Sequence, residues 1–245
     1  MLPEPFRIIA HRGASGYAPE NTMAAFQRAV DMGVNEIETD VHFTRDGELV
    51  LLHDHTLERT TDGHGTPADH TLGQLRRLDA GSWMGDEFAG ERLITLSELL
   101  TAFGDRLTYH VELKDRTAGI GAATAAVVRQ HGREADVLVS GFDCEVELLA
   151  AKAALPALRS TVLVSPELDT GAAIARAARD GHDGVSLYVE VITGDWVTAA
   201  HAVGLEVRCW GINTRDDMER GAATGCNGMT INWPDWLQQW VAPTG

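Results

Sequence analysis

The sequence has few cysteines, no long apolar run and a shortage of basic residues, and each shortage argues against a class of protein. The three cysteines, Cys144, Cys209 and Cys226, are odd in number and widely spaced, which favours reduced, buried thiols over disulfides or a zinc site. The sequence contains no run of about 18 apolar residues, so it predicts no membrane-spanning helix. Lys and Arg number 20 against 36 Asp and Glu, and the net charge of −16 opposes binding to nucleic acid or to anionic membranes.

The first residues, "MLPEPFRIIAHRG", lack the charged segment, apolar core and cleavage site of a secretory signal. We therefore expect a cytoplasmic protein with a small-molecule ligand and no stable membrane association; the oligomeric state is left open. A chain of 245 residues, 44% of them hydrophobic, is long enough for one large core. We expect residues 1–245 to form a single domain.

Short runs rich in Val, Ile and Leu alternate with helical patterns, which is typical of parallel strands covered by helices. The expected strands span 7–11, 34–41, 107–113, 136–140, 158–164, 183–187, 205–210 and 227–231. The expected helices span 22–32, 95–103, 118–131, 144–154, 170–180, 193–203 and 214–223. The fold class predicted by this alternation is α/β, a (β/α)8 TIM barrel.

One further strand pattern, "ELVLLH", follows the second barrel strand too closely for a parallel crossover. Asp46-Gly47 between them is a hairpin signal, so residues 49–53 are predicted to return antiparallel and to bring His53 beside Glu38 and Asp40. Residues 55–93 are rich in Gly, Thr and Asp and lack strong periodicity. They are predicted to form a small cap inserted after the second barrel strand.

Carboxylates share one face of two predicted strands. In "VNEIETDVHF", Glu38 and Asp40 alternate with apolar residues, and in "LTYHVELK" Glu112 and Lys114 do the same. Carboxylates that point into a barrel need a cation, and an all-oxygen cluster suits Mg²⁺ or Ca²⁺. Ion pairs of these carboxylates with Arg12 and Lys114 are the structural alternative.

Two histidines, His11 and His53, fall at strand ends on the same rim, where barrel enzymes carry their active sites. Histidine is the usual proton carrier near neutral pH, and a metal flanked by an acid and a base can cleave a phosphate ester. Trp210, at another strand end, either walls the site or belongs to the core. Glu206 and Arg208 share a face and are expected to form a buried ion pair.

Several short motifs occur in an order that resembles the glycerophosphodiester phosphodiesterase family, whose members are barrels like those of the phospholipase-C type. They are "AHRG", "PENT", "EIETDV", "TRDGELVLLHDHTLERTTDG", "LDAG", "TLSELL" and "VELK". The likeness is dense from about residue 8 to 115 and reduces to scattered matches afterwards. It implies a barrel with a small insertion and hydrolysis of glycerophosphodiesters to glycerol 3-phosphate and an alcohol.

The resemblance also implies roles for particular residues. His11 and His53 would be the acid and base, Arg12 and Lys114 would bind the phosphate, and one divalent cation would be bound. From its place at a strand end, and not from the resemblance, Trp210 is added to the substrate-binding candidates. The implied metal ligands are Glu38, Asp40 and Glu112.

Glu20 and Asn21 of "PENT" are weaker candidates. Helix capping is the favoured role of Asn21, and Glu20 would orient a rim group or reach the metal through water. The family commonly ends its last strand with "GxDGIxTDxP", whereas this chain has "GCNGMTINWP", which replaces two acidic residues with Asn227 and Asn232.

Other functions stay open at this point. A lysophospholipase D-like enzyme would use the same residues on a lysolipid, and a non-catalytic barrel would only bind glycerophosphodiesters. The preferred headgroup, the physiological ion, and the choice between direct attack by water and a cyclic phosphate are left open as well.

Overall fold

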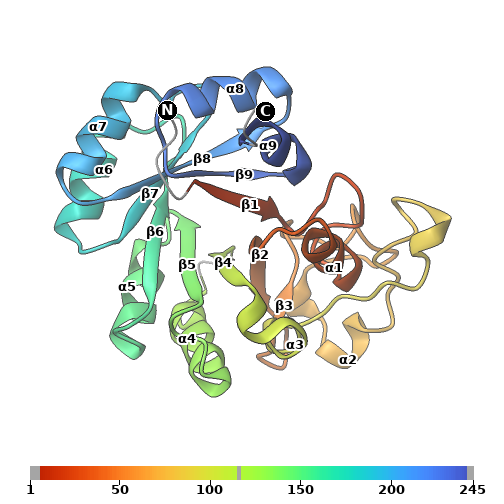
Figure 1. The fold of residues 1–245 in the computed structure, drawn as a ribbon. Coiled ribbons are helices and arrows are strands. Elements are labelled where there is room, and N and C mark those ends of the chain that lie inside the picture. Colours follow the sequence, from red (N-terminus) through yellow and green to blue (C-terminus); the bar gives the residue numbers. More distant parts are fainter. Residues whose placement is uncertain (1–5, 115–116, 242–245) are drawn as a thin grey trace.

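The protein is described by a computed structural model that covers residues 6–114 and 117–241. Its centre is a closed barrel of parallel strands with helices outside it (Figure 1). The barrel strands are β1 (Arg7–His11), β2 (Glu36–Phe43), β4 (Thr108–Leu113), β5 (Val137–Phe142), β6 (Arg159–Leu163), β7 (Gly184–Tyr188), β8 (Glu206–Ile212) and β9 (Gly228–Ile231). Because β1 pairs with both β9 and β2, the sheet closes on itself. The predicted (β/α)8 barrel is confirmed.

Most of the helices connect one barrel strand to the next. Polar N-caps begin several of them, as at Thr22, whose side chain accepts a hydrogen bond from the amide of Ala25. The helices are α1 (Met23–Asp31), α2 (Leu72–Leu75), α3 (Leu96–Phe103), α4 (Ile120–His131), α5 (Glu145–Ala154), α6 (Thr170–Arg179), α7 (Gly194–Ala202), α8 (Arg215–Ala223) and α9 (Pro234–Val241). Three short 3₁₀ turns are also assigned among the described residues, namely η1 (Pro67–Asp69), η2 (Asp86–Phe88) and η3 (Gly104–Arg106).

The predicted hairpin is present. The strand β3 (Leu49–Leu51) runs antiparallel to β2, with Val41 opposite Leu51, and lies outside the closed barrel. Gly47 adopts the left-handed conformation that its turn requires, with a φ of 84°. The amide of Leu52 then donates to the carbonyl of Asp40. The hairpin therefore returns the chain to the level of Asp40, as the sequence predicted for His53.

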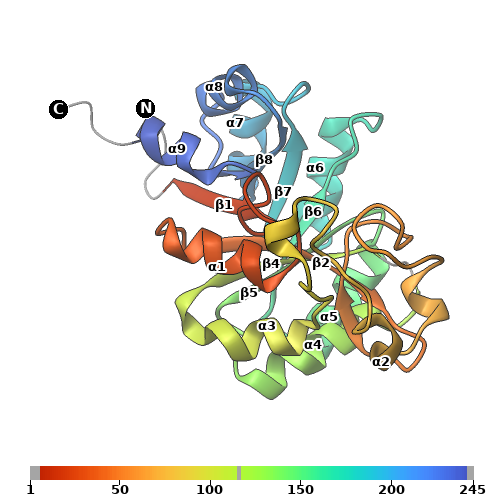
Figure 2. The same cartoon turned by 90° about the vertical axis from the view of Figure 1, so that its right-hand side faces the viewer.

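The segment between β3 and α3 contains only short helical turns. Figure 1 shows it, in orange and yellow, to the right of the barrel, and in the turned view of Figure 2 its yellow part lies in front of the barrel strands. It has an apolar cluster that is separate from the main core. This cap cluster consists of Val50, Leu52, Leu57, Leu75, Ala80 and Leu93, with Leu78 packed against it. The segment corresponds to the insertion expected at 55–93. That residues 1–245 act as one domain stays a prediction.

Inside the barrel the two faces of the strands differ as predicted. Ile37 and Val41 pack in the core between sheet and helices, whereas the intervening carboxylates point inward. The expected Glu206–Arg208 ion pair is wrong. Glu206 accepts from Arg7 at 2.9 Å, and Arg208 contacts His110 and Thr161. Side chains two residues apart on one strand lie in different layers of a barrel, and their partners come from other strands.

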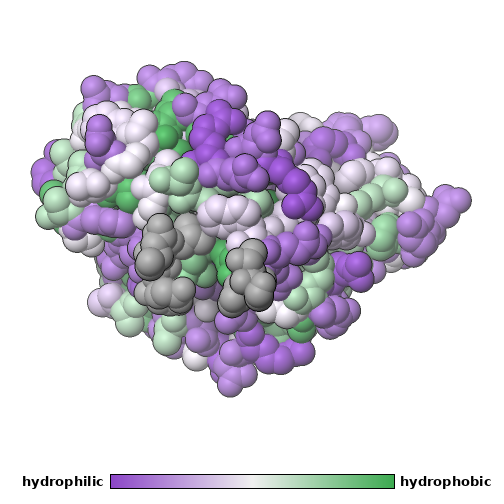
Figure 3. All heavy atoms as spheres, turned by 45° about the horizontal axis from the view of Figure 1, so that its top comes forward, coloured by the Kyte–Doolittle hydropathy of each residue, from purple (hydrophilic) through white to green (hydrophobic). Residues whose placement is uncertain are grey.

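Among the described residues, Cys144, Cys209 and Cys226 are buried thiols that belong to no disulfide, as expected. Within the described ranges, no helix combines the length and the apolar composition needed to cross a membrane. Figure 3 shows hydrophilic residues spread over the face that it draws, with hydrophobic ones between them.

Candidate active site

A cavity of about 190 Å³ opens at the carboxyl ends of the barrel strands. Among its lining residues are seven that the sequence predicted: His11, Arg12, Glu38, His53, Glu112, Lys114 and Trp210. Asp40 is fully buried behind them. The parallel strands all end at this face, which is why residues far apart in the sequence meet here.

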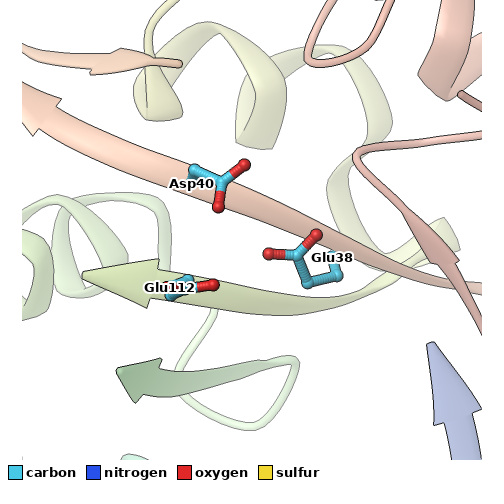
Figure 4. A group of neighbouring side chains, drawn as sticks. All are labelled: Glu38, Asp40 and Glu112. Atoms are coloured by element: carbon cyan, nitrogen blue, oxygen red, sulfur yellow. The ribbon is translucent and has the colours of Figure 1, made fainter. Parts of the chain in front are cut away.

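Three carboxylates converge at one side of the cavity. Glu38 and Asp40 come from β2 and Glu112 from the neighbouring β4, and Figure 4 shows their carboxyl groups gathered between the two strands. One oxygen of each can be chosen so that all lie within 4.8 Å of one another. Oε1 of Glu38 is buried and makes no hydrogen bond to any described residue. A buried, unpaired carboxylate oxygen in an all-oxygen group fits a hard divalent cation.

The carboxylates of this cluster outnumber the cationic side chains beside them. Burial raises the pKa of Glu38 well above its ordinary value, and the charges of Asp40 and Glu112 raise it further. Burial also raises the pKa of Glu112 to about 7. Burial opposes ionisation of Asp40 as well, but Lys114 and Arg12 hold the pKa of that carboxyl below its usual range. Three carboxylates therefore face two cationic side chains, and a bound cation would remove the repulsion.

The ion pairs of the structural alternative are present together with the cluster. Lys114 Nζ lies 2.7 Å from Glu112 and 3.3 Å from Asp40, and Arg12 Nε lies 3.3 Å from Asp40. The backbone amide of Arg12 donates to Glu38 at 3.1 Å. Both cationic side chains line the cavity, so they can face a ligand while they offset the carboxylates.

The two histidines reach the cavity from different elements. His11 ends β1, and its Nε2 lies 3.8 Å from Oε2 of Glu38. His53 follows β3, and its Nδ1 lies 2.7 Å from Oδ1 of Asp54, so Nε2 is left toward the cavity side. Burial lowers the pKa of both rings, with Arg12 adding to the effect at His11. Both shifts favour the neutral form of the ring, which must accept a proton before it can donate one.

Glu20 and Arg59 connect the cap to the rim of the barrel. Glu20 accepts from Arg12 at 2.8 Å and from Arg59 at 2.7 Å and 2.8 Å. Arg59 also donates to both oxygens of Asp54, the partner of His53. Glu20 thus orients a rim cation, one of the two roles considered for it from sequence.

The favoured capping role of Asn21 is wrong. The N-cap of α1 is Thr22, and Asn21 is buried with a φ of 57°. Its amide donates to Oδ2 of Asp40 at 2.8 Å and its carbonyl oxygen accepts from Thr39. This left-handed conformation turns the side chain inward, so Asn21 orients a carboxylate of the cluster.

An aromatic wall stands across the cavity from the carboxylates. The ring of Trp210 lies 5.2 Å from that of Phe142 and 4.7 Å from that of Tyr188, measured between centroids. Trp210 and Phe142 line the cavity, so of the two interpretations the structure favours Trp210 as a wall of the site.

Sequence reasoning missed several contacts of the site. Asp54 and Arg59 lie within the motif "TRDGELVLLHDHTLERTTDG", which could have drawn attention to them. They lie outside the strands, so the alternation of strand faces does not predict which residues they contact. The two asparagines, Asn227 and Asn232, lie at opposite ends of β9 and have different partners. Asn232 accepts from His11 at 2.6 Å, whereas Asn227 accepts from Val207 and His201 near the opposite end of β9.

Comparisons with known proteins agree with this geometry. The model of the Glycerophosphoryl diester phosphodiesterase family matches residues 11–236. A glycerophosphodiester phosphodiesterase of Caldanaerobacter subterraneus subsp. tengcongensis is 34% identical, over 97% of this chain and 98% of its own length. One from Bacillus subtilis is 30% identical, over 96% of this chain and 86% of its own.

Solved structures give the same result. A glycerophosphodiester phosphodiesterase of Agrobacterium tumefaciens superimposes with a TM-score of 0.81 at 27% identity, covering 96% of this chain and 99% of its own. A phosphodiesterase of Oleispira antarctica, in complex with the product sn-glycerol-3-phosphate, gives a TM-score of 0.85 at 32% identity, covering 97% and 96%. The chain therefore belongs to the glycerophosphoryl diester phosphodiesterase family and is, as its motifs predicted, a phosphoric diester hydrolase.

Proposed function

We propose that the protein hydrolyses glycerophosphodiesters to glycerol 3-phosphate and an alcohol in a reaction that depends on one divalent cation, Mg²⁺ or Ca²⁺. The observation that carries the proposal is the convergence of Glu38, Asp40 and Glu112 in a cavity that two histidines also line. The relative from Oleispira antarctica that binds sn-glycerol-3-phosphate supports the product.

Glu38, Asp40 and Glu112 would hold the cation, which when bound supplies a Lewis acid to the phosphate. Arg12 and Lys114 bind phosphate oxygens, Arg12 through its forked donors and Lys114 as a point charge. As negative charge builds up on the phosphorus oxygens, these two side chains stabilise it.

The histidines move the protons. Following the family's assignment, Nε2 of His11 accepts a proton from the attacking oxygen, and His53 donates one to the departing alcohol. Each ring uses its Nδ1 for a fixed partner, Asn232 for His11 and Asp54 for His53, so each presents Nε2 in one orientation.

The decisive experiment measures release of glycerol 3-phosphate from glycerophosphocholine, glycerophosphoethanolamine and glycerophosphoglycerol, with Mg²⁺ or Ca²⁺ and with a chelator. A parallel arm uses lysophosphatidylcholine and measures release of choline, because the other product of that hydrolysis is lysophosphatidic acid and not glycerol 3-phosphate. We expect metal-dependent release from at least one of the three soluble diesters. Release only from the lysolipid would identify a lysophospholipase D-like enzyme, and binding of the diesters without turnover would identify a non-catalytic barrel.

A further inference from the structure

The inside of this barrel is unusual below the level of Asp40 and Glu112. In barrels of this fold the interior is filled by layers of four side chains from alternate strands, and bulky branched residues dominate. These layers can be found from the residues that pair between neighbouring strands. Because the strands are tilted, a layer moves forward by roughly one residue from each strand to the next. One layer contains Glu38, Ser140, Ser186 and Thr230. Three of its four positions therefore carry small hydroxyl side chains instead of large apolar ones.

The three hydroxyl residues face the cavity. Ser140, Ser186 and Thr230 all line it, so the cavity extends below the rim that carries His11 and Glu112. No hydrogen bond joins the side-chain hydroxyl of any of these three residues to another described residue. Each hydroxyl can both donate and accept, and each is left for a ligand.

A buried guanidinium forms the floor of this chamber. Arg208 lies one layer below the hydroxyls, with His110 and Thr161, and both Arg208 and His110 line the cavity. Arg208 donates to Thr161 at 2.8 Å and contacts Nδ1 of His110, while its Nε is buried without a hydrogen bond. Neither partner is a carboxylate. Among the described residues, the floor therefore offers donors and a positive charge that no direct ion pair neutralises.

The carboxylates near the floor are paired with other groups. Glu36 accepts from His110 at 2.8 Å, and Glu206 accepts from Arg7 at 2.9 Å. Glu38, by contrast, belongs to the hydroxyl layer itself, so an anionic ligand at that level would lie against a carboxylate. An acyl chain would leave the hydroxyls and the guanidinium without partners, which is costly in a buried site. The chamber therefore suits an uncharged, hydroxylated group.

We propose that Ser140, Ser186 and Thr230, above Arg208, form a subsite for the terminal hydroxyl of the substrate's glyceryl group. The inference rests on the proposed function, because it places the phosphate at Arg12 and at Nζ of Lys114, which lies 2.7 Å from Glu112 in the layer above the hydroxyls. One layer corresponds to one residue along a strand, about 3.3 Å before tilt. The three carbons of a glyceryl group therefore reach from the rim to the hydroxyl layer, and the subsite selects glycerol over alcohols that lack this hydroxyl.

The test compares two 4-nitrophenyl phosphodiesters, one of glycerol and one of 1,2-propanediol joined through its primary oxygen. Both keep the hydroxyl next to the phosphate-bearing carbon, both release nitrophenolate, and they differ only in the terminal hydroxyl. With metal saturating, we expect the wild-type kcat/KM to favour the glyceryl ester by about tenfold or more, because a site built to bond a hydroxyl rejects the analogue without it.

Ser140→Ala, Ser186→Ala and Thr230→Val each remove one hydroxyl at nearly constant shape. Each should lower that preference several-fold, and the triple variant should bring it to about threefold or less. Ser97→Ala, on α3 outside the cavity, is the matched control and should keep the wild-type preference. Melting temperatures identify variants that are poorly folded.

A wild type that cleaves both esters equally, or chamber variants that keep the wild-type preference, would overturn the subsite while the proposed function stands. Failure of the wild type to cleave any diester would instead remove the proposed function. In that case, calorimetry on the metal-loaded wild type tests the subsite without turnover. It measures the affinities for glycerol 3-phosphate and for 1,2-propanediol 1-phosphate. Tighter binding of glycerol 3-phosphate supports the subsite, and equal affinities contradict it.

Discussion

Nδ1 of His11 donates a hydrogen bond to Oδ1 of Asn232 over 2.6 Å, and the two residues are 221 positions apart in the chain. The hydrogen bond fixes the tautomer of the ring, and although it raises the pKa of His11, burial outweighs it and lowers that pKa. His53 has a carboxylate, Asp54, in the equivalent place. Burial lowers the pKa of His53, and the Asp54 carboxylate opposes that shift. This difference agrees with His11 as the proton acceptor and His53 as the proton donor.

The assignment predicts that the leaving group will separate the two histidines. His11→Ala and His53→Ala should each lower kcat by about 10² to 10⁴ on a natural diester with an alkoxide leaving group. A nitrophenolate needs little protonation, so a nitrophenyl diester should largely rescue His53→Ala and leave His11→Ala defective. Steady-state rates of both variants on both substrates check this. Rescue of His11→Ala alone would reverse the roles.

Removal of the divalent cation should abolish turnover and lower the melting temperature. The ion binds the folded cluster and not the unfolded chain, so it stabilises the fold by mass action. Glu112→Gln should lose most of the metal-dependent shift in Tm, whereas Glu219→Gln, an exposed carboxylate on α8, should keep it. Thermal melts over a titration of Mg²⁺ or Ca²⁺ measure the shift. Full activity after exhaustive chelation would contradict a metal-dependent reaction.

The affinity for the cation should depend on pH. In the protein without a cation the pKa of Glu112 is raised to about 7, so this carboxyl is protonated below that pH and must lose its proton to become a ligand. The apparent Kd should therefore weaken as pH falls below about 7, by up to about tenfold per unit for each proton displaced. Titration calorimetry at about pH 6 and pH 8, in buffers of different ionisation enthalpy, measures both affinity and proton release. Equal affinities and no proton release would be inconsistent with this mechanism.

Arg59 should act as a positioning residue through both of its carboxylate partners. Asp54 orients His53 and Glu20 orients Arg12, so Arg59→Met should lower kcat/KM by about 10- to 100-fold. The loss in kcat should be larger with an alkoxide than with a nitrophenolate leaving group, which a purely structural defect would not produce.

Arg59→Lys should recover little, because an ammonium cannot make the forked contacts. Arg45→Met is the control. Arg45 also ties the cap together, through Asp69 and Gln74, but makes no such contact with the catalytic side chains. If Arg59→Met and Arg45→Met lower kcat/KM equally, Arg59 only holds the cap in place and does not position the catalytic side chains.

The barrel and its carboxylate cluster could be predicted because the signals are local. Alternation of Glu38 and Asp40 with apolar neighbours assigns one strand face, and the Asp46-Gly47 turn places His53 opposite. The contacts of Asn21 and Asn232 depend on a left-handed backbone and on closure of the barrel, which no short pattern encodes. Arg208 illustrates the same limit. Its partner His110 follows from the register of all the strands between them.

The cap has its own apolar cluster, separate from the barrel core, and this divides the molecule into two units that can unfold at different free energies. Amide hydrogens of the cap should then exchange with solvent through a sub-global opening that leaves the barrel strands protected. Such an opening would move Arg59 and the Asp54–His53 pair away from the rim while Glu38, Asp40 and Glu112 stay assembled on the barrel. The cation site and the proton donor would thus belong to different cooperative units, and the departing alcohol could leave without disturbing the carboxylates.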